Sequence, residues 1–130
     1  LAAKLGLRDT RFTDPTGLGG PGHYTSARDL ATLSLYAMTF PVFREIVGTE
    51  THVALGTREP PLYNQTPLLN YTPGVDGIKT GFTEEAGPTF VVSATRGGHS
   101  IVVVLLNAPG IPFTAIDLIE WAFANHEWPP

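Results

Sequence analysis

The last third of the chain carries the pattern that most constrains its fold. Within residues 89–96, the apolar set Phe90, Val92 and Ala94 alternates with Val91, Ser93 and Thr95, whereas residues 101–106 are continuously apolar. Gly97 and Gly98 lie between the two runs and can adopt the positive φ angles of a tight two-residue turn. A strand that is apolar on both faces requires cover on both faces. The pattern therefore predicts an antiparallel hairpin with strands at 89–96 and 99–107, packed against helices.

A third strand is predicted over residues 75–83, which include the triplet Lys79-Thr80-Gly81. On an edge strand, the ammonium and hydroxyl groups can hold a carboxylate, and glycine lets an extended peptide lie against the backbone. Strict alternation sends Lys79 and Thr80 to opposite faces. Both reach one groove only if the strand bends or ends there, which Gly81 would permit. Alone, the triplet is weak and is equally typical of a solvated lysine beside a turn.

Helices are predicted on either side of these strands. Ser26 can cap a helix that Pro41 ends, and the acidic Asp29 suits its positive start, so we expect Arg28 and Asp29 to be capping and solvated charges. The apolar stripe of this helix predicts that it lies on a core; its members are Leu30, Leu33, Ala37 and Phe40. A final helix, with Thr114 as its cap, has a second stripe made of Ile116, Ile119 and Phe123.

The remaining segments are shorter. We expect residues 1–6 to end a helix at Gly6, residues 7–13 to form a short strand, and residues 42–47 a short helix. Residues 49–55 alternate like an edge strand. The glycine- and proline-rich residues 14–24 predict a loop, and loops of this length in small domains are often ordered and tied to a site.

Composition excludes several classes of function. A chain of 130 residues with 42% hydrophobic and 15% charged residues fits one globular domain. A net charge of −4 argues against a nucleic-acid partner, and the absence of cysteine excludes disulfide and thiolate chemistry. The four histidines are scattered and no phosphate-binding glycine loop precedes a helix, so we expect neither a metal site nor a cofactor. The sequence shows no signal peptide or membrane anchor in this segment.

Residues 76–83, followed by Ala86-Gly87, resemble the third active-site motif of the low-molecular-mass penicillin-binding proteins. These are the serine D-alanyl-D-alanine carboxypeptidases of peptidase family S11. Further stretches look like this family, in the same order along the chain: Leu5-Gly6-Leu7, Phe12, Pro15-Thr16-Gly17-Leu18, residues 24–30 and Trp121-Ala122-Phe123. The resemblance implies an α+β fold, the C-terminal part of a β-lactamase/transpeptidase-like domain with an antiparallel sheet and packed helices.

The family's mechanism uses a serine nucleophile in an S-x-x-K motif, a second S-x-N motif and the K-T-G strand. The serines of this chain are Ser26, Ser34, Ser93 and Ser100; none has lysine three residues later or asparagine two residues later. Residues 1–130 are therefore expected to be a partial catalytic domain that lacks the first two motifs. Such a chain supplies the K-T-G strand but cannot perform acyl transfer alone.

The resemblance implies roles for individual residues. Lys79 and Thr80 would hold the substrate carboxylate and support the proton network, and the backbone N–H of Phe82 would be one oxyanion-hole donor. Gly81 and Thr83 would complete the substrate-binding strand. Some family members place an arginine near the site, but Gln65 and residues 111–113 supply none.

By resemblance, the parent protein is a hydrolase of peptidoglycan metabolism that contributes to cell-wall biosynthesis and cell shape. It would remove the terminal D-alanine of pentapeptide stems through an acyl-serine, bind β-lactams and be inhibited by penicillin, on the extracytoplasmic side of the membrane. Expected protein partners are the missing N-terminal half or a second copy of the chain. Two alternatives stay open: another hydrolase of the β-lactamase superfamily, and a catalytically inactive fragment or binding module.

Overall fold

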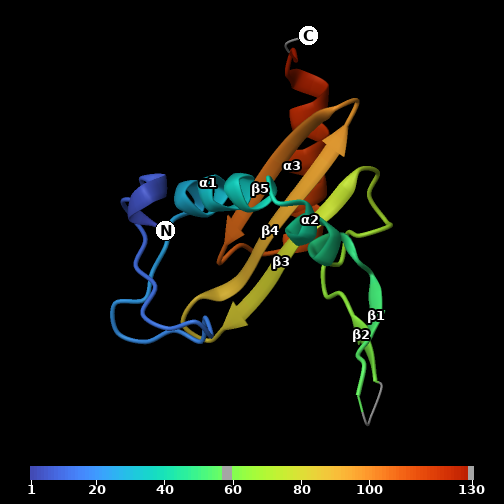
Figure 1. Ribbon diagram of the computed structural model, residues 1–130. Helices are drawn as coiled ribbons and strands as arrows, with labels where there is room; N and C mark the ends of the chain where they lie inside the picture. The colour runs from blue at the N-terminus through green and yellow to red at the C-terminus, as the bar shows by residue number, and fades with distance from the viewer. Residues whose placement is uncertain (57–59, 129–130) are drawn as a thin grey trace.

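The computed structural model describes residues 1–56 and 60–128 and combines helices with two antiparallel sheets (Figure 1). In chain order the elements are the 3₁₀ helix η1 (Ala3–Leu5), α1 (Ala27–Ala37), α2 (Pro41–Gly48), β1 (Thr51–Val53), β2 (Pro61–Tyr63), β3 (Val75–Thr83), β4 (Gly87–Arg96), β5 (His99–Leu106) and α3 (Ile111–Asn125). The α+β class predicted from the sequence is confirmed.

The central sheet has three strands in the order β3-β4-β5, and each strand pairs antiparallel with the next along the chain. The strand predicted at 75–83 has those bounds in the structure. The other two strands differ from the prediction only at their ends, β4 beginning at Gly87 and β5 ending at Leu106. The glycine pair at 97–98 forms the turn between them, with positive φ angles of 57° and 85°.

One face of the sheet packs against α3 and forms the core. Phe90, Val92 and Ala94 of β4 are fully buried there, together with Ala115 and Ile119 of α3. Alternation along β4 aims these three side chains at the helix, as the sequence predicts. Figure 1 shows α3 running along the back of the sheet, on the side opposite α1.

The start of α3 differs from the prediction. Gly110 is the N-cap residue, with a left-handed φ of 62°, and Pro112 lies in the first turn. Thr114 is already inside the helix, because its backbone N–H donates to the Gly110 carbonyl at 3.1 Å. Proline suits the first turn of a helix, where no intrahelical bond needs its missing N–H. The prediction that Thr114 caps this helix was therefore wrong.

The opposite face of the sheet is only partly covered. Helix α1 packs against β4 and β5, and α2 packs against β3. Of the apolar residues 101–106, Leu105 is buried on the α3 side, whereas Val102, Val104 and Leu106 on the α1 side are half-buried. Both faces of β5 have helical cover, as expected, but the cover on the α1 side is incomplete.

The start of α1 confirms one prediction and corrects another. The Ser26 hydroxyl accepts a hydrogen bond from the Asp29 backbone N–H at 3.2 Å, as expected of an N-cap. Asp29 is not a solvated charge, because it is only 5% exposed. Its carboxylate accepts from the backbone N–H of Asp9 at 2.8 Å and from the Thr10 hydroxyl at 2.7 Å. Asp29 therefore ties the incoming chain to the helix start.

The strands outside the central sheet are shorter than the sequence predicts. Residues 7–13 form a single bridge, Arg11 with Tyr24, in place of a strand. The strand within 49–55 is β1 (Thr51–Val53), and it pairs antiparallel with β2, which begins at Pro61. Gly6 caps η1 in the left-handed conformation, as predicted.

Within residues 1–56 and 60–128, no single helix is long and apolar enough to cross a membrane. Helices α1 and α2 pass such a test only when joined, and they are bent by 110° at their junction.

Candidate functional site

A cavity of about 860 Å³ opens between the sheet, α1, α2 and the N-terminal loop. Its wall is mostly apolar, and the lining residues whose side chains carry a polar group are His23, Tyr24, Thr25, Ser34, Lys79, Thr80 and Thr89. A large apolar hollow with a few convergent polar groups is the usual form of a binding site. The incomplete cover over the α1 side of the sheet is the physical origin of this cavity.

Lys79 and Thr80 both line the cavity, so the structure brings the predicted pair together. In the β3–β4 pairing Lys79 faces Val91 on the cavity side, whereas Thr80 faces Phe90 on the α3 side, so the two side chains leave β3 on opposite faces, as strict alternation predicts. The Lys79 side chain is exposed, and its ammonium group donates to the Thr80 carbonyl at 2.5 Å. A short reorientation of this flexible side chain would free the ammonium for an anionic ligand.

The expected bend or end at Gly81 is not present, because β3 continues in regular pairing to Thr83. A Cβ atom at Gly81 would stand 2.7 Å from the Thr89 hydroxyl, which donates to the Gly81 carbonyl at 3.0 Å. A neighbour on β4 therefore restricts the space for a side chain at residue 81. The irregularity in β3 lies earlier, between Val75 and Gly77.

The last two predicted site residues lie on β3 beyond the cavity wall. Phe82 faces Pro88, and its side chain is 71% exposed. Thr83 faces Gly87, and its hydroxyl accepts from the Ala86 backbone N–H at 3.0 Å. The Thr83 side chain thus closes the turn between β3 and β4, a role that sequence reasoning did not foresee.

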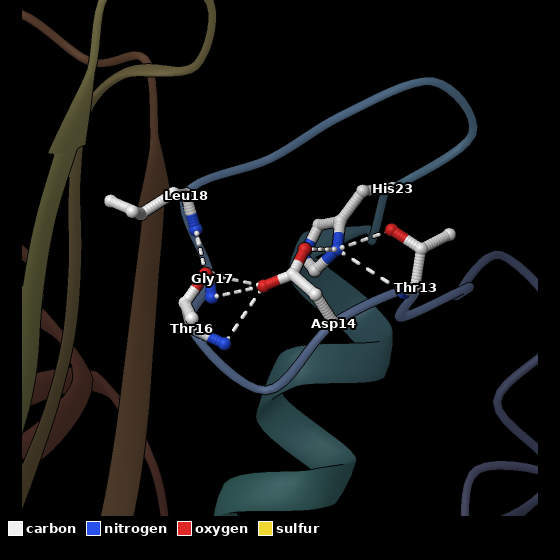
Figure 2. Close-up of polar contacts among 6 residues, drawn as sticks. All are labelled: Thr13, Asp14, Thr16, Gly17, Leu18 and His23. Atoms are coloured by element: carbon white, nitrogen blue, oxygen red, sulfur yellow. Dashed lines mark hydrogen bonds and ion pairs between the residues drawn. The ribbon is translucent and has the colours of Figure 1, made fainter.

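The N-terminal loop forms one rim of the cavity and is ordered by the carboxylate of Asp14 (Figure 2). Asp14 Oδ1 accepts from the hydroxyl and the backbone N–H of Thr16 at 2.5 and 2.8 Å, and from Gly17 N–H at 3.0 Å. These hydrogen bonds, the Thr16 hydroxyl first, lower the pKa of Asp14. An aspartate that binds the backbone two residues later is typical of an Asx turn, and this signal could have predicted the loop's form.

His23 links the two ends of this loop. Its Nδ1 accepts from the Thr13 backbone N–H at 3.2 Å and lies 3.3 Å from Asp14 Oδ2 (Figure 2). His23 and Gly17 both line the cavity, which agrees with the expectation that the loop is tied to a site. Sequence reasoning considered His23 only as a metal ligand and missed this role.

Among residues 1–56 and 60–128, no three histidine, cysteine, aspartate or glutamate side chains come together as a group that could hold a metal ion. The polar groups that the cavity does offer are hydroxyls, an ammonium and an imidazole. They suit recognition of a carboxylate and hydrogen-bonding groups of an extended ligand.

The sheet, the covering helices and the lysine-threonine edge strand together define a domain of the penicillin-binding and DD-peptidase class. The crystal structure of the Streptomyces K15 DD-transpeptidase matches with a TM-score of 0.89 at 32% identity, covering 95% of this chain and 51% of that chain. A D-alanyl-D-alanine carboxypeptidase structure from Mycobacterium tuberculosis H37Rv matches with a TM-score of 0.87 at 36% identity, covering 96% and 51% of the two chains.

The family model for peptidase S11, described as D-alanyl-D-alanine carboxypeptidase, matches residues 1–110, and the chain belongs to this family. Among curated proteins, D-alanyl-D-alanine carboxypeptidase DacF of Bacillus subtilis is 33% identical over 99% of this chain and 34% of its own length. DacB2 of Mycobacterium tuberculosis is 36% identical over 95% of this chain and 45% of its own length. The chain thus spans less than half the length of these two relatives.

Proposed function

We propose that this chain is the C-terminal half of the catalytic domain of a serine-type D-alanyl-D-alanine carboxypeptidase. The parent protein removes the terminal D-alanine of peptidoglycan stem peptides through an acyl-serine, and penicillin inhibits it by acylating the same serine. Membership of family S11 supports the reaction class. The observation that carries the proposal is that Lys79 and Thr80 are both among the residues that line one apolar cavity beside an edge strand.

The open edge of β3 is the proposed seat of the substrate. Within the described residues, β4 is the only strand that pairs with β3. The other edge of β3 therefore presents backbone groups that an extended peptide can pair with. The Lys79 ammonium and the Thr80 hydroxyl bind the terminal carboxylate of this peptide. The Phe82 N–H, two residues further along the strand, stabilises the oxyanion of the acyl intermediate.

The nucleophilic serine and its lysine come, in this proposal, from a segment outside the printed sequence. The apolar wall of the cavity supports this assignment, because α1 and α2 leave half-buried apolar side chains there; Leu30, Leu33, Phe43 and Val47 are among them. A segment that carries the serine covers these side chains and brings its hydroxyl beside Lys79. Because stem peptides lie outside the cytoplasmic membrane, the parent protein acts there.

Mass spectrometry after incubation with penicillin tests this proposal. The full-length polypeptide that carries this chain should gain the mass of one drug molecule, and the 130-residue chain alone should gain none. Covalent labelling of the chain alone would contradict the assignment of the nucleophile to another segment. If the full-length protein gains no adduct, the proposal that it is a penicillin-sensitive enzyme is contradicted, and the alternative of an inactive binding module is favoured.

The reaction product separates the carboxypeptidase from another hydrolase of the superfamily. A carboxypeptidase releases D-alanine from a pentapeptide that ends in D-Ala-D-Ala and holds penicillin as a long-lived adduct. A β-lactamase instead turns over penicillin many times and releases no D-alanine. Measuring both on one preparation decides between the two.

A further inference from the structure

The pairing of β3 with β4 contains one irregularity, and it lies just before Lys79. Val75 faces Ala94, but the next pair is Gly77 with Ser93. On β4 the partners Ala94 and Ser93 are consecutive, whereas on β3 Asp76 lies between Val75 and Gly77. Asp76 is therefore an extra residue without a partner in the register. One extra residue in one strand of an antiparallel pair is a β-bulge.

This bulge determines which face of the sheet Lys79 lies on. Residues that face each other across an antiparallel pair share a face, and a shift of one residue moves every later side chain to the other face. Counted from Val75 without the bulge, Lys79 would face Phe90, which is fully buried beneath α3. With the bulge it faces Val91, which lines the cavity.

The carboxylate of Asp76 holds the bulge in place. It accepts a hydrogen bond from the Ser93 hydroxyl and, at 2.8 Å, one from the Thr95 hydroxyl. Ser93 is only 2% exposed, so its hydroxyl has little access to water as an alternative partner. Removing the carboxylate would leave this buried hydroxyl without its acceptor, which is costly. Both hydroxyls belong to β4, and the carboxylate thus fixes β3 to its neighbour at the point where the register changes.

Helix α2 fits closely over the same point. A Cβ atom at Gly77 would stand 2.7 Å from Val47 Cγ2, and one at Gly48 would stand 3.3 Å from the Asp76 carbonyl oxygen. Arg44 of α2 and Asp76 line a common small cavity of about 60 Å³. The bulge is thus fixed by β4 on one side and by α2 on the other.

We propose that Asp76 is a positioning residue: its carboxylate, bound to Ser93 and Thr95, locks the bulge that places Lys79 on the cavity face. This inference rests on the proposed function for its effect on catalysis, whereas its effect on strand register stands independently. Asp76 itself touches no reacting atom and acts through the position of Lys79.

The kinetic test compares penicillin acylation in the full-length polypeptide with Asp76→Ala, Asp76→Asn and Ser100→Ala. Ser100 is the matched control, because its hydroxyl lies 2.8 Å from that of Thr95, whereas the Asp76 carboxylate accepts from Ser93 and Thr95. We expect Asp76→Ala to lower the acylation rate at least tenfold while the final amount of labelled protein stays unchanged. Asp76→Asn keeps one oxygen acceptor and should recover most of the rate, and Ser100→Ala should stay within about twofold of the parent.

The structural test measures strand register by NMR in the 130-residue chain. The unsubstituted chain should show backbone contacts between Gly77 and Ser93 and between Lys79 and Val91, as the pairing requires. In Asp76→Ala these contacts should weaken, and amide hydrogens of residues 77–81 should exchange at least tenfold faster. Asp76→Asn, which keeps one acceptor, should retain most of these contacts. If the alanine variant does not fold, Thr95→Ala, which removes one of the two hydroxyl partners of the carboxylate, should weaken the same contacts in part.

The outcomes separate this inference from the proposed function. A normal acylation rate with less labelled protein would show that Asp76 is needed only for folding, and would overturn the inference. A lower rate with unchanged register contacts would overturn it as well. If the full-length parent is never acylated, the proposed function fails, and the register measurement alone decides whether Asp76 holds Lys79 on the cavity face.

Discussion

The Thr89 hydroxyl donates a hydrogen bond to the Gly81 carbonyl at 3.0 Å and occupies the space where a side chain at residue 81 would begin. The third residue of the lysine-threonine-glycine strand is thus restricted by its neighbour on β4, before any ligand is considered. Gly81 does not have the positive φ angle that would call for glycine on backbone grounds. Steric exclusion by Thr89 and close approach of a substrate are therefore two separable reasons for glycine at this position.

Substituting Gly81 with and without Thr89 separates these reasons. Gly81→Ala alone should destabilise the protein by about 1–2 kcal/mol, because its methyl group collides with the Thr89 hydroxyl. Adding Thr89→Ala removes that collision and should restore the melting temperature. If a substrate also lies against residue 81, acylation by penicillin stays impaired in the stable double variant. Recovery of both stability and acylation would show that Gly81 serves Thr89 alone; Thr89→Ala by itself is the control.

Lys79 should contribute to catalysis and hardly to stability. Lys79→Ala in the full-length polypeptide should lower acylation by penicillin at least about a hundredfold, or about 3 kcal/mol in the transition state. The melting temperature should change little, because the side chain is exposed and its ammonium donates to the carbonyl of the next residue, an acceptor that water can replace. Lys4, the only other lysine of the chain, provides the matched control as Lys4→Ala. Near-normal acylation of the Lys79 variant would remove this residue from the site.

The sheet was predictable because its signals are local. Alternation over 89–96, the glycine pair and the apolar run 101–106 specify a hairpin without reference to the rest of the chain. The bounds of β3 followed from the same kind of pattern. The helix start at Ser26 was also predictable, since a cap residue and an acidic residue lie three positions apart in the sequence.

The predictions that were wrong concern features that depend on contacts between residues distant in the sequence or on the local turn at a helix start. Asp29 was interpreted as solvated because its partners, Asp9 and Thr10, lie far from it in the sequence. The bulge at Asp76 is set by Ser93 and Thr95 on another strand, so strict alternation along β3 gave no sign of it. Thr114 was chosen as a cap because threonine has that preference, whereas the turn at Gly110 starts the helix earlier.

The ion pair between Arg96 and Glu120 should make a small, pH-dependent contribution to stability. Two hydrogen bonds, at 2.8 and 2.6 Å, join the guanidinium at the end of β4 to the carboxylate on α3. The hydrogen bonds from Arg96 lower the pKa of Glu120 below its ordinary value. A depressed folded-state pKa means that the contribution is present above about pH 4.5 and is lost as the pH falls through the folded-state pKa.

Because the Glu120 side chain is 52% exposed, solvent screening limits this contribution to about 0.5 kcal/mol. Glu120→Gln should lower the free energy of unfolding by this amount at pH 7 and flatten the loss of stability between pH 5 and pH 3, as measured by urea unfolding. Asp117→Asn, on an exposed residue of the same helix, is the control for charge removal. An unchanged pH profile in Glu120→Gln would show that the pair contributes nothing.

The isolated chain should expose the apolar wall of its cavity. Leu33 lines the cavity and is half-buried, whereas Leu35 on the same helix is 52% exposed and lies outside that wall. If the wall is an open apolar surface, the chain binds a dye such as ANS or associates with itself at high concentration. Leu33→Gln should reduce dye binding and association severalfold, and Leu35→Gln should reduce them much less. Calorimetry on both variants shows whether each remains folded. A monomeric parent chain that binds no dye, or equal effects of the two substitutions, would contradict the assignment of this wall as the surface that the remaining half of the catalytic domain covers.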